Sequence, residues 1–163
     1  RWRSSTRREG AVAHLWADGR IASRDAPLAY WPGAGDGRAR EGLLRAHPLL
    51  HDGIVSGEAF GRTLLNGGLE GRWWLGSVMG VTIGAAAFVD AARAWRTLDR
   101  ADGGESVGEP HSTTSPVLVD AGVGLRAALP GRSGGVRADV ARGLRGEGWT
   151  LQVGWEAPWP FSF

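Results

Sequence analysis

The stretch VLVDAGVGLRAAL, residues 117–129, decides the fold of this chain. Its odd-numbered positions, from Val117 to Leu129, are all apolar, whereas its even-numbered positions include Asp120, two glycines and Arg126. Successive side chains of a β-strand point to opposite faces of a sheet, and helical spacing would mix the two sets. The alternation therefore predicts a strand with one apolar face and one polar or small face.

Five further segments show the same period of two. They are residues 11–21, 63–75, 81–91, 136–141 and 149–157. The match is poorest in the first of them, because His14 and Trp16 share a face with Asp18 and Arg20. Together the six segments predict an all-β chain.

Two properties distinguish a membrane barrel from a soluble β-sandwich. Most of the segments run roughly 9 to 13 residues, close to the ~9–11 of a tilted membrane strand and longer than the ~5–6 typical of soluble strands. A sandwich would also have to bury the polar positions of the alternation in a dry core, which is costly for each unpaired charge. These positions are Glu70, Arg72, Asp90, Asp120, Arg126, Arg137, Asp139, Gln152 and Glu156. A water-filled lumen accepts them, so we expect an antiparallel transmembrane β-barrel.

The expected connections fit the same architecture, because outer-membrane barrels alternate short periplasmic turns with longer outer loops. Tight turns are expected at 76–80 and 130–135, and long loops at 22–61 and 96–116. Only the connection at 142–148 is shorter than its side of the barrel predicts. Several tryptophans fall near strand ends, which favours rings at the membrane boundary over a platform for stacking a ligand.

Composition excludes several other classes of protein. All 19 basic residues are Arg, but the net charge is only +2 and acids and bases are interspersed. No basic block could follow a phosphate backbone, so we expect no nucleic-acid partner. The absence of Cys excludes disulfides and cysteine ligands. No apolar run approaches the ~20 residues of a membrane helix, so any crossing of a membrane would use strands.

No catalytic, cofactor or metal site is expected. Residues 131–135 fit the GxSxG pattern around Ser133, but in a hydrolase this pattern stands between a strand and a helix, and here a strand follows. His47 and His51 are four residues apart, yet Pro48 keeps them from sharing one helical face. We therefore expect a protein that is not an enzyme.

The start of the sequence indicates a longer protein. The chain begins at Arg1 without an initiator Met or a signal-peptide pattern. About six strands cannot close a barrel of useful bore by themselves. We expect residues 1–163 to be the carboxy-terminal portion of one barrel domain whose amino-terminal strands lie upstream.

Short motifs in three segments carry a family resemblance. They are Leu44-Arg45-Ala46-His47, Leu69-Glu70-Gly71-Arg72 and Phe88-Val89-Asp90-Ala91-Ala92. In this order they resemble the Leu/Val-Arg-Gly-Phe/Tyr motif of a loop that folds into the lumen, an inward Glu, and a Phe-x-Asp-x-Gly motif. These features belong to the BamA and TamA group of outer-membrane assembly and secretion barrels, the bacterial surface antigen family. Departures from the motifs occur at Ala46, His47 and Ala92.

Further positions extend the resemblance toward the end of the chain. Gly124, Arg126 and Asp139 belong to a pattern similar to the penultimate strands of the family. Leu44 and Phe88 occupy apolar positions of the first and third motifs.

The resemblance implies a lumenal cluster of ion pairs. In this cluster the Arg45 guanidinium meets the carboxylates of Glu70 and Asp90 and pins the loop. The alternation places both carboxylates on the polar faces of their strands without reference to the family. A planar guanidinium can hold two carboxylates at once.

The aromatic residues Trp155, Phe161 and Phe163 resemble a carboxy-terminal signal by which the assembly machinery selects outer-membrane barrels. Pro158 and Pro160 cannot donate to a strand ladder. The last paired strand is therefore expected to end near residue 156, with the tail as an extension.

The resemblance also implies a function. The implied protein is a barrel of about sixteen strands with amino-terminal periplasmic modules. It inserts or translocates proteins at the bacterial outer membrane. Its partners would be outer-membrane lipid, client outer-membrane or secreted proteins and the barrel-assembly machinery. An imperfectly paired last strand would offer backbone groups to a client strand. Two alternatives stay open: a passive porin or structural barrel whose lumenal charges tune solute passage, and the barrel part of a lipase-linked outer-membrane protein.

Overall fold

A computed structural model describes residues 2–5, 7–35, 44–47, 50–51, 54–55, 59–96, 113–131, 134–145 and 148–156. Within these ranges the chain consists of β-strands, their connections and one short 3-10 helix, η1 (Leu28–Tyr30). No helix in the described ranges is long and apolar enough to cross a membrane.

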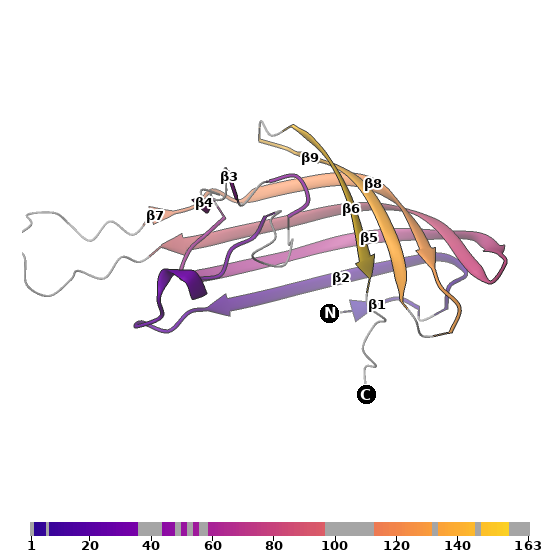
Figure 1. Ribbon diagram of the computed structural model, residues 1–163, viewed down its shortest axis with the longest axis horizontal. Helices are drawn as coiled ribbons and strands as arrows, with labels where there is room; N and C mark the ends of the chain where they lie inside the picture. Colours follow the sequence, from indigo (N-terminus) through magenta and orange to yellow (C-terminus); the bar gives the residue numbers. More distant parts are fainter. Residues whose placement is uncertain are drawn as a thin grey trace, which may run out of the picture.

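Eight strands form the main sheet. They are β1 (Trp2–Arg3), β2 (Gly10–Ile21), β5 (Thr63–Val78), β6 (Val81–Arg96), β7 (Thr113–Thr114), β8 (Leu118–Ala128), β9 (Gly135–Gly143) and β10 (Trp149–Glu156). The order across the sheet is β1-β2-β5-β6-β8-β9-β10, and β7 pairs with β6 beside the start of β8 (Figure 1). A separate hairpin joins β3 (Leu50–His51) to β4 (Ile54–Val55).

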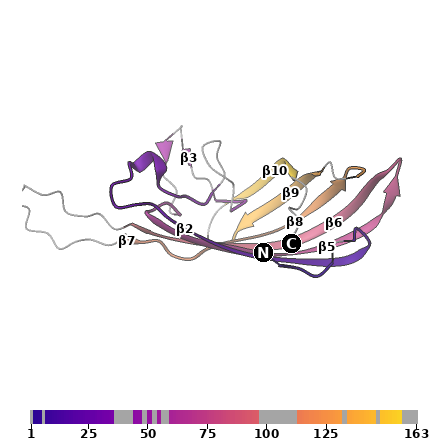
Figure 2. The same cartoon turned by 90° about the horizontal axis from the view of Figure 1, so that it is seen from below.

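All six strands expected from the alternation are present, as β2, β5, β6, β8, β9 and β10. Every pairing between them is antiparallel, so the all-β, antiparallel fold is confirmed. The sheet is open, with β1 and β10 at its two edges. Figure 2 shows that the sheet is curved and that the described residues between β2 and β5 lie over its concave side.

The hairpin between β5 and β6 is tighter than the expected turn at 76–80. The turn consists of Met79 and Gly80 alone, with φ angles of 51° and 81°, and two positive φ angles suit the twist of a two-residue hairpin. Gly76 instead lies inside β5, where the pairing register shifts between Trp74 and Gly76. A β-bulge therefore replaces the wider turn, and both strands extend to 16 residues.

Part of the expected 96–116 loop is also paired. Ser115 donates its backbone N–H to the Ala94 carbonyl at 2.8 Å, and the Ala94 N–H donates to Ser115 Oγ at 2.8 Å. Pro116 has no N–H for the ladder, which explains why pairing stops after β7 and resumes in β8.

The two faces of the sheet have inverted polarity. Large apolar side chains on the face away from the loop are between 40% and 71% exposed. They are Leu15, Leu65, Leu69, Trp73, Ile83, Val89, Val123, Leu125, Val136, Val140, Trp149, Leu151, Val153 and Trp155. Charged side chains of the same strands are buried on the concave side, among them Glu70, Asp90, Asp120, Arg126 and Asp139. A soluble sheet protein shows the opposite distribution.

The poor match of residues 11–21 to the alternation has a packing explanation. Leu15 and Ile21 are exposed on the apolar face of β2, as in the other strands. Trp16 lies opposite Gly68 of β5, and a Cβ on Gly68 would come within 2.4 Å of Trp16 Cζ2. The indole therefore occupies the space that the glycine leaves on the polar side of the sheet.

We expect Gly122→Ala to lower the free energy of unfolding by about 1–3 kcal/mol, because the added methyl group overpacks the sheet. A Cβ there would lie 2.5 Å from Phe88 Cζ and 2.3 Å from the Val140 carbonyl oxygen. Gly19→Ala is the matched control, since its nearest neighbour is Leu65 Cδ1 at 3.9 Å. Urea unfolding in detergent micelles measures both, and equal effects of the two substitutions would contradict the prediction.

Candidate functional site

Four consecutive residues of the connection between β2 and β5 are buried on the concave side of the sheet. These residues, Leu44 to His47, are here called the loop tip, and each is at most 6% exposed. Leu44 belongs to an apolar cluster with Leu64 of β5 and Leu118 of β8. Ala46 belongs to another with Phe88 and Ala141. Apolar contacts therefore seat the loop tip on both sides of Arg45.

Arg45 lies at the centre of three carboxylates. Its Nη2 is 2.9 Å from Glu70 Oε2, its Nε is 2.9 Å from Asp90 Oδ2, and its Nη1 is 3.1 Å from Asp139 Oδ2. The Arg45 Cζ also stacks 3.6 Å from the centroid of the Phe88 ring. Because the guanidinium is planar, its edges can face carboxylates while its flat face contacts the aromatic ring.

A second buried guanidinium shares two of these carboxylates. Arg126 Nε lies 3.0 Å from Glu70 Oε1, and Arg126 Nη1 lies 2.5 Å from Asp139 Oδ1. Glu70 and Asp139 therefore bridge Arg45 and Arg126, whose side chains are 5% and 1% exposed. Charges removed from water to this degree are stable only when they are matched in this way.

Two more arginines complete the network at its edge. Arg72 Nε donates to Glu70 Oε1 at 2.6 Å, and its Nη1 donates to Glu156 Oε2 at 2.9 Å. Arg137 Nη1 lies 3.6 Å from Asp139 Oδ2. We call the ion-paired residues Arg45, Glu70, Arg72, Asp90, Arg126, Arg137, Asp139 and Glu156 the arginine cluster.

Hydrogen bonds to the backbone also hold the loop tip. Asp120 accepts from the Ala46 N–H at 2.5 Å and pairs with His47 Nδ1. On the other side, Gln152 Nε2 donates to the Arg45 carbonyl at 3.0 Å. With the ion pairs of Arg45, the loop tip is bonded to β5, β6, β8, β9 and β10.

Two glycines give the arginine cluster its space. A Cβ on Gly124 would lie 2.0 Å from Asp139 Oδ1 and 2.7 Å from Arg126 Nη1, and one on Gly68 would lie 2.6 Å from Asp90 Oδ1. Any side chain at either position would push a carboxylate out of the network. The glycines of these strands therefore shape the site.

Asp90 depends most strongly on Arg45. Its side chain is 1% exposed, and neither carboxylate oxygen makes a well-aligned hydrogen bond within the described ranges. The ion pair with Arg45 Nε is thus its principal compensation. A buried carboxylate that loses its cation is strongly destabilising.

The structure brings together the residues of the predicted loop-anchoring cluster. Arg45, Glu70 and Asp90 are in direct contact, and the other motif positions surround them, namely Leu44, Phe88, Gly124, Arg126 and Asp139. Of the three terminal aromatics, Trp155 is 57% exposed on the apolar face. Phe161 and Phe163 lie outside the described residues, and β10 ends at Glu156.

Sequence reasoning missed several partners of the loop tip. Asp139 was not expected to bind Arg45, and the contacts of Asp120 with His47 and of Gln152 with the Arg45 carbonyl were not anticipated. Alternation had placed all three strand residues on the polar faces, which is the signal that could have identified them.

The contacts among the described residues of this site are suited to holding a loop in place. Within them, no group of three or more His, Asp or Glu side chains could bind a metal ion. Ser133 and Pro48 lie outside the described residues.

Arg45→Met should lower the free energy of unfolding by about 3–5 kcal/mol, because the buried Asp90 carboxylate loses its cation. Arg20→Met is the control, since the Arg20–Asp18 pair is exposed by 39% and 43% and surface pairs contribute about 0–1 kcal/mol. Chemical unfolding in micelles measures the difference. Similar losses in the two variants would show that the Arg45 pairs do not hold the loop.

Comparisons with known proteins find no family model that matches the sequence, no similar curated protein and no similar solved structure.

Proposed function

We propose that this chain is the carboxy-terminal part of a bacterial outer-membrane β-barrel that inserts or translocates client proteins. The observation that carries the proposal is the position of the loop tip, which is bonded through Arg45 to three strands on the concave side. A passive pore requires an open lumen. A loop fixed inside the curve of the sheet by buried ion pairs favours a gated or occupied lumen instead.

The inverted polarity of the sheet supports a membrane location. Leu151 and Val153 are both 71% exposed in β10, and Val123 is 60% exposed in β8. Lipid chains would cover such a face, whereas water would leave a large apolar area unburied. The tryptophans Trp149 and Trp155 lie at opposite ends of β10, as expected for rings at two membrane interfaces.

The open edge of the sheet supports the client-binding role. Among the strands that the structure describes, β10 pairs only with β9, and in this proposal the backbone groups on its other side are open to another strand. Strand addition at such an edge supplies main-chain hydrogen bonds to an incoming segment without covalent chemistry. In this proposal the edge at β10 receives client strands while the arginine cluster keeps the loop in place.

The membrane location can be tested with Val123→Arg. In a bilayer, Arg at the centre of a lipid-facing strand should lower the free energy of unfolding by about 2–4 kcal/mol. If the same face lies in water, the change should stay within about 0.5 kcal/mol. Unfolding titrations in lipid vesicles measure it, with Arg145→Leu, in the connection after β9, as a control for altered charge. A loss in vesicles no larger for Val123→Arg than for the control would refute the location.

The assembly role can be tested by reconstituting the full-length protein in vesicles with an unfolded client barrel. Arg45→Ala should conduct ions but reduce client assembly to nearly the rate of vesicles without the protein. The exposed Arg20→Ala should leave client assembly unchanged. Unchanged assembly by Arg45→Ala would contradict the proposal and favour a passive porin.

A further inference from the structure

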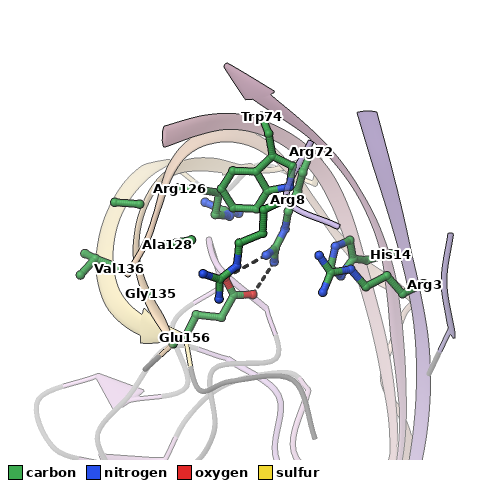
Figure 3. A pocket seen from close by; sticks show the side chains of 12 residues that line it. Arg3, Arg8, His14, Arg72, Trp74, Arg126, Ala128, Gly135, Val136 and Glu156 are labelled. Carbon is green, nitrogen blue, oxygen red and sulfur yellow. Dashed lines mark hydrogen bonds and ion pairs between the residues drawn. The ribbon is translucent and has the colours of Figure 1, made fainter. Parts of the chain in front are cut away.

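A cavity opens on the concave side of the sheet next to the arginine cluster (Figure 3). Its walls come from both edges and the middle of the sheet, because Arg3 belongs to β1, Arg72 and Trp74 to β5, and Glu156 to β10. Arg8 of the connection between β1 and β2 also lines it. Figure 3 shows these side chains pointing toward one another across the opening.

The arginines that line this cavity differ in their ion pairing. Arg72 pairs with Glu70 and Glu156, so these acids are already engaged. Arg3 and Arg8, in contrast, have no carboxylate of the described chain within ion-pair distance, and Arg8 Nη1 donates only to the Leu129 carbonyl, at 2.7 Å. Two guanidinium groups therefore face the cavity without an ion pair to any carboxylate that the structure describes, and the acid in the lining, Glu156, is paired with Arg72.

Two buried donors at the same cavity also lack an acceptor. Arg3 Nε and Trp74 Nε1 are buried, and neither has a hydrogen-bond partner among the residues that the structure describes. Buried N–H groups in native proteins are nearly always paired. Both donors line the cavity, so an acceptor placed there would satisfy them.

We propose that this cavity binds a phosphate group. Guanidinium groups of Arg3 and Arg8 and the indole N–H of Trp74 approach from different elements, which suits oxygens that point in several directions. The tetrahedral oxygens of a phosphate meet this need better than the coplanar pair of a carboxylate. Arg binds phosphate through forked, charge-assisted hydrogen bonds. The cavity shares Glu156 with β10, but its binding of phosphate does not depend on the client-binding role.

Two sources could supply the group, namely phosphate in solution and the headgroup of a lipid. The location of the cavity is compatible with a headgroup, because Trp73 and Trp155, the chain neighbours of Arg72 and Glu156, are exposed on the outer face at this end of the sheet. Tryptophan rings collect at the level of lipid headgroups. The two sources are distinguished by the choice of probe.

The test is isothermal titration of the full-length protein, in a zwitterionic detergent without phosphate, with inorganic phosphate and with dihexanoyl phosphatidic acid. The double substitution Arg3→Gln and Arg8→Gln should weaken binding about tenfold or more, because it removes two charge-assisted contacts. Arg142→Gln with Arg145→Gln changes the net charge equally at the opposite end of β9, where both residues are exposed. This control should bind within about twofold of the unmodified protein.

A third variant, Trp74→Phe, keeps the ring and removes the indole N–H. It should weaken binding several-fold even if the double variant folds poorly. Binding of inorganic phosphate supports a site for the free anion, and binding of the lipid probe alone supports a headgroup site. No measurable binding of either probe would overturn the proposal, and so would binding that neither the double variant nor Trp74→Phe weakens relative to the control.

Discussion

The burial of one positive charge organises this structure. Arg45 can leave water only because carboxylates from β5, β6 and β9 surround it, and a buried charge without such partners would be strongly unfavourable. The three strands must therefore curve around one point. A single-layer sheet has no second layer to pack against, and here the loop tip, with Leu44 and Ala46 in apolar contacts beside the charge, takes the place of that layer.

The inverted polarity follows from the same constraint. Because polar side chains gather around the loop tip, the alternation of each strand sends apolar side chains to the other face, where Leu151 and Val153 are highly exposed. Glycine makes this possible on the polar side, since Gly68 and Gly124 leave room for the carboxylates of Asp90 and Asp139. Sequence alternation, small residues and ion pairs thus depend on one another.

This dependence explains which features could be predicted from the sequence. A period of two is a local property, so it identified six strands and assigned Glu70 and Asp90 to the polar side. The register between strands is not a local property, because it depends on which residues of two separate segments pair. For that reason alternation could not tell which inward carboxylates would be neighbours, and Asp139 was missed as a partner of Arg45. The contact of His47 depends on the path of a long loop, which periodicity does not describe.

The energetics also determine what kind of loop this is. A lid that opens must be able to leave its site at a cost of a few kcal/mol. Withdrawal of the loop tip would remove the Arg45 charge from three carboxylates. Asp90 would then have no ion pair with any residue that the structure describes. Glu70 and Asp139 would still have Arg126, so the penalty would fall mainly on Asp90. Such an uncompensated buried carboxylate costs about 3–5 kcal/mol, and the apolar contacts of Leu44 add to it. The buried ion pairs therefore hold the loop tip on the concave surface, and a movement that keeps these pairs requires the strands that carry the carboxylates to move with it.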